Sequence, residues 1–294
     1  MPKGGAQTQT DYFQQEVHHR IEVRLDDSLH QLEGHQQITY INHSPDTLRE
    51  IYMHLWPNAY STVRSAFAKQ QLRLGKDEFF FAPPEERGGY RRIGFTAEGD
   101  SLRWQYVAPH PDIALVRLPH PLAPGDSIVI GSEWLLQLPR IFSRLGHEGQ
   151  SYMITQWYPK PAVYDREGWH PMPYLEFGEF YSEFGDFDVR ISLPRNYVVA
   201  ATGTLQTPEE RRFLLERMEK TLEKIRLELP PSDEVPPSDT AWKTIRFTAS
   251  GVHDFAWFAD KRFNVRMQEV VLPSGKEVVA AAYFLDSGLE LWKK

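Results

Sequence analysis

The sequence predicts an all-β protein: a large antiparallel saddle-shaped sheet or sandwich with one inserted amphipathic helix at about 208–229. Three observations lead to this prediction. Many short segments alternate apolar and polar residues with a period of two, turn residues separate them, and a single long segment changes to helical periodicity. With 294 residues, of which 41% are hydrophobic, the chain can build a substantial core.

The first strands are read from alternation in the N-terminal part. In the segment 17–25, "VHHRIEVRL", the residues Val17, Ile21 and Leu25 fall on one side, with polar residues opposite. The next segment, "QQITYI", runs into a turn at 42–46, and "LREIYMHL" alternates again. This pattern is typical of antiparallel strands joined by tight turns.

The region 60–100 is less regular, and "FFFAPPEERGGYRR" is expected to be a loop anchored by the buried residues 79–81. Strand patterns resume in "SLRWQYV", "IALVRLP" and "DSIVIGSEWLLQL". Further strands are expected at "DFDVRISLP", "YVVAATG", "WKTIRFTAS", "FNVRMQEVVLP" and "KEVVAAAYFL". Strands in this number, separated by turns, indicate a sandwich or a large twisted sheet.

The helical segment begins with Thr207, Pro208 and Glu210, which form a capping-box pattern with proline at the first helical position. Apolar residues then recur at a spacing of three or four: Leu215, Met218, Leu222, Ile225 and Leu229. The helix is expected within an insertion, residues 207–240, between two strands. We favour a helix that lies on the sheet of its own chain, with pairing to a partner helix as the alternative.

Charge and composition exclude several classes of protein. A net charge of −7 argues against nucleic acid or an anionic membrane as the main partner. The chain has no cysteine, which excludes disulfides, thiolate zinc sites and cysteine nucleophiles. No apolar run approaches the roughly 20 residues of a membrane span. The polar opening 1–15 is expected to be a flexible lead-in, not a signal peptide, so the compartment is left open.

No metal site and no catalytic residue are expected in this chain. His147 and Glu148 begin an H-E-x-x-H pattern in a glycine-broken loop, but Ser151 stands at the position of the second histidine. His18 and His19 are neighbours in a strand and therefore point to opposite faces. Motifs for a serine nucleophile elbow, a P-loop or a dinucleotide-binding loop do not occur.

Carboxylates near aromatic residues can form a glycosidase site, and five follow the aromatic segment: Glu176, Glu179, Glu183, Asp186 and Asp188. The favoured interpretation is that they belong to the solvated face of a strand over 180–193. The apolar residues Phe187, Val189 and Ile191 would then point inward.

The segment 153–174, "MITQWYPKPAVYDREGWHPMPY", combines prolines with aromatic rings and is expected to be an ordered loop. Gln156 lies at its entrance. The amide oxygen of a glutamine can accept a hydrogen bond from an ammonium group, so Gln156 could hold a substrate amine beside Trp157 and Tyr158. The alternative, which composition alone favours, is that Gln156 satisfies backbone groups of the loop.

A long co-linear pattern resembles a known family. "RIEVRLDDSLHQLEGHQQITYINHSPDTLREIYMHLWPNAY" is similar to the opening strands of the aminopeptidase N-like zinc metallopeptidases, peptidase family M1 of the gluzincins. The resemblance continues through "TQWYPKPAVYDREGWHPMPYLEFGEFYSEFGDFDVRISLPRNYVVAATGTL" and "WKTIRFTASGVHDFAWFADKRF". It implies a single N-terminal saddle domain over 16–285, with the insertion 207–240 as a departure, and 286–294 as the start of a connection to a missing catalytic domain.

The resemblance also implies a function. The parent would be a zinc-dependent aminopeptidase that removes N-terminal amino acids from peptides, and this domain would cap the cleft. Gln156 would anchor the α-amine, with Trp157 and Tyr158 as possible walls of the first pocket. Zinc would be bound by the catalytic domain, the main partner besides the peptide, in a secreted or periplasmic parent. Because the chain lacks H-E-x-x-H, it is expected to be inactive alone.

Two alternatives from other classes stay open. The first is a free-standing carbohydrate-binding β-sandwich that stacks sugars on the rings of Trp157, Tyr158, Trp169 and Tyr174. The second is an interaction scaffold that pairs through the apolar stripe over 215–229. A sugar-binding module requires exposed, coplanar rings, whereas a saddle domain buries most of them.

Overall fold

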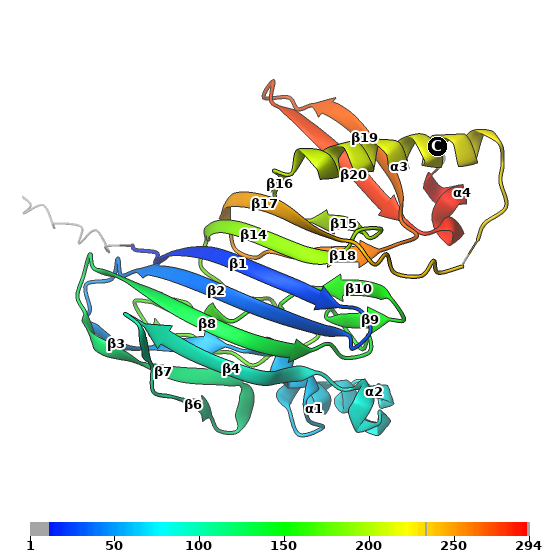
Figure 1. Cartoon of the computed structure of the whole chain (residues 1–294). Helices are drawn as coiled ribbons and strands as arrows, with labels where there is room; N and C mark the ends of the chain where they lie inside the picture. The colour runs from blue at the N-terminus through cyan, green and yellow to red at the C-terminus, as the bar shows by residue number, and fades with distance from the viewer. Residues whose placement is uncertain (1–11, 233, 293–294) are drawn as a thin grey trace, which may run out of the picture.

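The computed structural model describes residues 12–232 and 234–292 and confirms the all-β class (Figure 1). Its main layer is an eight-stranded sheet in the order β16-β17-β14-β1-β2-β8-β4-β5. The strands are β1 (Glu16–Asp26), β2 (Gln31–Ile41), β4 (Gly89–Ala97), β5 (Asp100–Ser101), β8 (Ser127–Gln137), β14 (Gly185–Pro194), β16 (Thr204–Leu205) and β17 (Trp242–Val252). Neighbouring strands are antiparallel except β1 and β14, which run parallel.

Two smaller sheets pack against one face of the large sheet. One has the order β15-β18-β10-β9 and the other β11-β3-β7-β6. Their strands are β3 (Leu48–His54), β6 (Trp104–Val107), β7 (His110–Leu122), β9 (Gly146–Glu148), β10 (Ser151–Ile154), β11 (Lys160–Pro161), β15 (Val198–Ala201) and β18 (Trp257–Asp260). A hydrophobic core lies under each of the two smaller sheets.

Alternation along the long strands sets this arrangement. The apolar residues of β1 are buried on one face together with His19, and the polar residues of the other face are partly or fully exposed, as the period of two requires. Ile21 and Val23 lie beside Val189 and Ile191 of β14, so the apolar rows of the two strands continue each other. Register is fixed because a slip of one residue would expose the whole row.

The region 60–100, expected to be less regular, contains two short helices, α1 (Ala66–Arg73) and α2 (Glu78–Phe81). The predicted loop over 79–92 begins within α2 and ends within β4. Of the expected aromatic anchor only Phe79 is buried, whereas Phe80 and Phe81 are 37% and 73% exposed. The reason is the helical turn, which directs three consecutive side chains around the axis so that one faces the core. Short 3-10 turns lie at Trp56–Tyr60, Pro84–Glu86 and Asp286–Gly288.

A two-stranded hairpin, β19 (Asn264–Val271) with β20 (Glu277–Phe284), projects from the sandwich, and α3 (Pro208–Arg226) lies along it (Figure 1). The predicted helix is therefore present and ends at residue 226, not 229. The capping box does not form: the hydroxyl of Thr207 accepts a hydrogen bond from the backbone N–H of Arg246 instead. A short helix, α4 (Leu289–Trp292), follows the hairpin.

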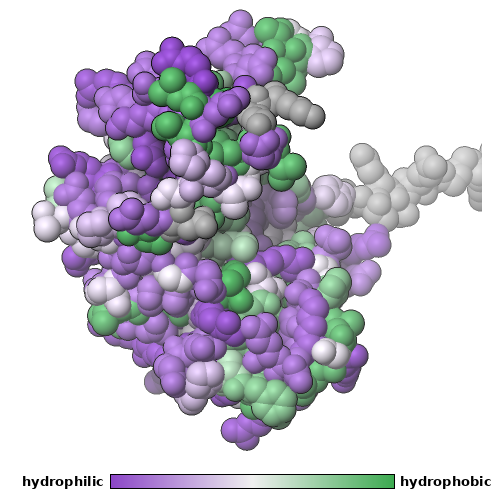
Figure 2. Space-filling view, turned by 90° about the vertical axis from the view of Figure 1, so that its right-hand side faces the viewer, coloured by the Kyte–Doolittle hydropathy of each residue, from purple (hydrophilic) through white to green (hydrophobic). Residues whose placement is uncertain are grey.

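α3 packs on its own chain, as favoured, but through a partly different face from the predicted stripe. Leu214 and the polar residues Glu210 and Thr221 are buried, while Leu215 and Leu222 stay 48% and 46% exposed. Figure 2 shows hydrophobic side chains at the surface at its upper end, the height at which α3 and the hairpin lie in Figure 1. The helix therefore leaves part of its apolar surface uncovered within the described residues.

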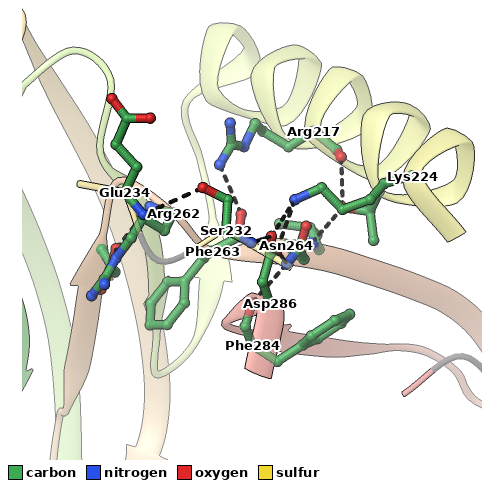
Figure 3. Close-up of polar contacts among 12 residues, drawn as sticks. Arg217, Lys224, Ser232, Glu234, Arg262, Phe263, Asn264, Phe284 and Asp286 are labelled. Carbon is green, nitrogen blue, oxygen red and sulfur yellow. Dashed lines mark hydrogen bonds and ion pairs between the residues drawn. The ribbon is translucent and has the colours of Figure 1, made fainter. Parts of the chain in front are cut away.

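Polar contacts fasten α3 to the hairpin and to the chain that follows it (Figure 3). Lys224 Nζ donates to both carboxylate oxygens of Asp286, at 2.7 and 2.8 Å. Asn264 Nδ2 and the backbone N–H of Ser232 donate to the same carboxylate at 2.7 and 2.8 Å. One buried carboxylate thus joins the helix, its return loop and the hairpin.

Candidate functional site

The proline-rich segment between β10 and β14 contains the candidate site. Within residues 155–184 the regular pieces are two-residue strands, β11, β12 (Tyr164–Asp165) and β13 (Gly168–Trp169), because proline removes ladder donors. Gln156 lies two residues beyond the end of β10 and has a φ of 54°, a left-handed conformation that non-glycine residues rarely adopt. This conformation turns the chain out of β10 and into the loop.

Three side chains of this segment converge on Asp254, which lies in the loop between β17 and β18. Gln156 Nε2 donates to Asp254 Oδ2, and Tyr158 OH donates to Asp254 Oδ1 at 2.8 Å. Lys160 Nζ lies 3.4 Å from Asp254 Oδ1 and donates to Gln156 Oε1 at 2.7 Å. The segment bends at Gln156 and at Tyr158, so the convergence comes from the path of the loop and not from the alternation of a regular strand.

The two ends of the Gln156 amide are bound to groups of opposite kind. An ammonium group can only donate, and a carboxylate can only accept. Lys160 therefore requires Oε1 on its side, and Asp254 requires Nε2 on the other. The usual ambiguity between the oxygen and the nitrogen of an amide is thereby removed by chemistry.

The ammonium of Lys160 lies in a cage of rings and acceptors. The residue is 3% exposed, and Nζ is 4.4 Å from the ring centroid of Trp56 and 5.6 Å from that of Tyr158. Burial lowers the pKa of Lys160, and the charge of Asp254 acts in the opposite direction. The aromatic faces and the carboxylate together provide the partners that a buried cation needs.

Two buried histidines lie next to this cage and are neutral. Burial, together with the nearby charge of Lys160, lowers the pKa values of His19 and His54 to about 3. Nε2 of His54 accepts from the backbone N–H of Met172 at 3.1 Å. The only charges at the centre of the site are therefore those of Lys160 and Asp254, among the described residues.

Trp157 and Tyr158 are part of the core: their exposed fractions are 0% and 1%. The indole N–H of Trp157 donates to the backbone oxygen of Phe255 at 2.9 Å, and its ring packs edge-on against Trp134 and Trp257. These rings hold the loop from inside. A role for the two residues as walls of a pocket stays a prediction.

Lys160 and Asp254 were missed by sequence reasoning. Lys160 lies only four residues after Gln156, but the bends at Gln156 and Tyr158 leave no regular period from which its contact could be predicted. No local signal identifies Asp254, which comes from a loop 94 residues away from Lys160. Only the packing of β18 beside β10 brings the two together.

The carboxylates that follow the aromatic loop do not all belong to a solvated face. Glu176 pairs with Lys76 at 2.9 Å, and Asp188 forms two hydrogen bonds with Arg246. Glu183, in contrast, is 9% exposed, and burial raises its pKa to about 7. The expected solvation is wrong for Glu183, because the strand begins at residue 185 instead of 180 and Glu183, in the irregular segment before it, is buried.

Among residues 12–232 and 234–292, no group of three or more histidines, aspartates and glutamates is placed to hold a metal. His147 and Glu148 lie in the strand β9, where a loop was predicted, and the His147 ring stacks on His30 at 3.7 Å between centroids.

No helix in the described part of the chain is long and apolar enough to cross a bilayer.

A sugar-stacking platform also lacks exposed rings. Of the four rings that it requires, those of Trp157, Tyr158 and Tyr174 are at most 1% exposed, and Trp169 is half-buried. Stacking on a sugar needs an accessible ring face. The rings of this loop pack against one another and against the sheets instead.

Comparison with known proteins shows a similarity of fold to solved structures, without a match in sequence. No protein-family model matches the sequence, and a search of curated proteins finds no match. Among solved structures, a mutant of the M1 zinc metallopeptidase from Deinococcus radiodurans, bound to a Tyr-Ser-Ala substrate, is similar. The identity is 15%, the match covers 92% of this chain and 47% of that chain, and the TM-score is 0.50.

The M1 zinc metallopeptidase from Deinococcus radiodurans without this mutation matches at 15% identity, over 92% of this chain and 46% of that chain, with a TM-score of 0.48. The chain thus spans about half the length of these solved structures. At this level of identity the comparison shows that the chain shares the fold of about half of an M1 zinc metallopeptidase.

Proposed function

We propose that this chain is the N-terminal substrate-capping domain of a zinc-dependent aminopeptidase, with residues 16–285 as the domain and 286–294 leading to the catalytic domain. The observation that carries the proposal is the fold shared over 92% of this chain with about half of an M1 zinc metallopeptidase. Under this proposal zinc and the hydrolytic residues belong to the catalytic domain, and no catalytic step is performed by this chain.

The proposed task of Gln156 is to bind the free α-amine of a peptide. Its amide oxygen already accepts a hydrogen bond from the ammonium of Lys160, and the carboxylate of Asp254 beside it supplies the negative charge that favours a cation. A carbonyl oxygen has two lone pairs, so Oε1 has the capacity to accept a second hydrogen bond, which the proposal assigns to the ligand amine. A hydrogen bond to an ammonium contributes about 1.5–3 kcal/mol, which is lost when the amine is blocked.

The experiment uses this chain and the protein extended through the reading frame downstream of Lys294. Zinc content and cleavage of aminoacyl and N-acetylated chromogenic substrates are measured for both. The proposal predicts zinc binding and cleavage of free-amine substrates by the longer protein only. If the extension binds no zinc, or if acetylated and free substrates are cleaved equally well, the proposal is wrong.

A glutamine variant tests the amine anchor within the longer protein. Gln156→Ala is expected to raise KM for free-amine substrates about 10- to 100-fold, the equivalent of one charge-assisted hydrogen bond. The matched control is Gln31→Ala, which removes a glutamine that pairs with Gln137 on the large sheet. An equal effect of the two variants would contradict the proposed role of Gln156.

A further inference from the structure

We propose that Lys160 and Asp254 are positioning residues that fix the side-chain amide of Gln156 for recognition of a peptide α-amine, an inference that rests on the function proposed above. The arrangement comprises a donor-only group on one end of the amide and an acceptor-only group on the other. Both groups come from the chain itself.

Orientation is the first step of the argument. An amide that rotates by 180° exchanges its acceptor and donor ends, so a free glutamine would meet a ligand ammonium with either end. In this site the rotated amide would place NH2 against the ammonium of Lys160 and an oxygen against the carboxylate of Asp254. Both contacts would be repulsive, so one orientation is selected before a ligand arrives.

Charge balance is the second step. Lys160 is almost completely buried, and the Asp254 side chain is 18% exposed, so the carboxylate lies at the edge of the site. The two charges compensate each other, which lets the cation remain in the core. Tyr158 OH and the backbone N–H of Phe255, at 2.8 and 2.9 Å, fix Asp254 Oδ1 in turn. The carboxylate is therefore held independently of Gln156.

The alternative is that the cluster only stabilises the loop. Under that reading, removing Asp254 lowers stability but leaves amine recognition intact in the molecules that remain folded. A test must therefore read out the Gln156 amide and the Michaelis constant as well as unfolding. The substitution Asp254→Asn serves this purpose, because it replaces an acceptor-only group by one that can both donate and accept.

The first measurement is made on this chain by NMR of the glutamine side-chain amides. In the wild type, the Gln156 NH2 signals are expected to be well separated and slow to exchange with water. In Asp254→Asn the chemical-shift separation of the two Gln156 NH2 signals is expected to decrease, and their hydrogen exchange with water is expected to be at least several-fold faster. The amide of Gln31, bound to Gln137, is the internal control. Unchanged Gln156 signals in Asp254→Asn would overturn the proposal.

The second measurement uses the longer protein. Asp254→Asn is expected to raise KM for free-amine substrates about tenfold with kcat nearly unchanged. The double variant Gln156→Glu with Asp254→Asn keeps the net charge and keeps a hydrogen bond between an amide and a carboxylate. Position 156 then carries a carboxylate, whose two oxygens both accept hydrogen bonds, so the rotation of this side chain no longer changes what a ligand amine contacts. The double variant is expected to return KM to within about threefold of wild type.

The outcomes separate the two proposals. If the double variant restores thermal stability but not KM, the cluster is structural only and the positioning role is overturned. A longer protein that has no peptidase activity overturns the proposed function, and the role in amine recognition falls with it, whatever the spectra show. An active longer protein whose Gln156 signals do not respond to Asp254→Asn overturns the positioning role alone.

Discussion

The ammonium of Lys160 lies 2.7 Å from Oε1 of Gln156, so the chain places an amine of its own on the oxygen that was predicted to receive a substrate amine. The contact has a simple physical basis, since a buried ammonium needs acceptors and an amide oxygen is one. It also means that the Gln156 side chain is ordered by the protein before any ligand is bound.

The burial of Lys160 makes a prediction about its reactivity. Reductive methylation should modify Lys69, which is exposed on α1, and leave Lys160 unmodified in the folded chain. Access limits the reaction, because the ammonium is enclosed by Trp56, Tyr158 and its hydrogen-bond acceptors. Peptide mass spectrometry after brief labelling measures both sites. Equal labelling of the two lysines would show that the cage is open in solution.

Glu183 predicts an unusual dependence of stability on pH. Burial raises its pKa in the folded chain to about 7, although backbone N–H groups of Tyr164 and Gln15 act in the opposite direction. The folded state then binds more protons than the unfolded state between the two pKa values, so stability falls as pH rises from about 4.5 to 7 and is constant above.

The variant Glu183→Gln should remove this loss, which amounts to about 3 kcal/mol in total. Urea unfolding at pH 5 and pH 8 gives the difference in free energy of unfolding for each protein. Glu179→Gln, which removes an exposed carboxylate from the same loop, is the matched control. If the wild type and Glu183→Gln lose the same stability between pH 5 and pH 8, Glu183 is not buried as described.

Two leucines of α3 predict how the helix is attached. Leu214 is 5% exposed and packs against Val198 and Val265, whereas Leu222 is 46% exposed. Leu214→Ala should therefore cost about 2–4 kcal/mol of unfolding free energy, and Leu222→Ala less than about 1 kcal/mol. Chemical unfolding of the two variants measures the difference. The reverse order would mean that the helix lies on the chain through its predicted stripe.

The carboxylate of Asp286 predicts a clamp between α3 and the hairpin (Figure 3). Burial alone would raise its pKa, but hydrogen bonds from Asn264, Lys224 and Ser232 outweigh burial and lower it. Asp286→Ala should cost about 2 kcal/mol at pH 7 and less at acid pH, where the wild-type carboxylate is protonated. The rate of hydrogen exchange of the α3 backbone amides should increase in the same variant.

Asp239→Ala is the control for this clamp, because Asp239 pairs with the exposed Arg195 at the surface. A loss of stability as large as that of Asp286→Ala would show that the effect is not specific to the contact between α3 and the hairpin. Unchanged exchange of the α3 amides in Asp286→Ala would likewise contradict the clamp.

Much of the fold could be predicted from the sequence because alternation is a local property. Val17, Ile21 and Leu25 face the core as their spacing requires, and α3 begins at the predicted Pro208. The parallel pairing of β1 with β14 could not be predicted, since partners far apart in the chain leave no local signal. Strand boundaries also differ from the prediction, as before β14, where Glu183 is buried in an irregular segment.

The site was predicted only in part. Gln156 was identified from the loop that surrounds it, and its left-handed backbone and buried amide make it an unusual position. Its partners Lys160 and Asp254 were not identified, because the first was read as one residue of a proline-rich loop and the second comes from a distant turn. Convergence of this kind depends on the tertiary packing of two sheets.

The most direct test of the account is the ratio of kcat/KM for a free-amine substrate to that for its N-acetylated form, measured in the longer protein for the wild type and Gln156→Ala. The account predicts a high ratio in the wild type that falls about 10- to 100-fold in the variant, with zinc content unchanged. A ratio that is the same in both proteins would contradict the central claim that Gln156 receives the substrate amine.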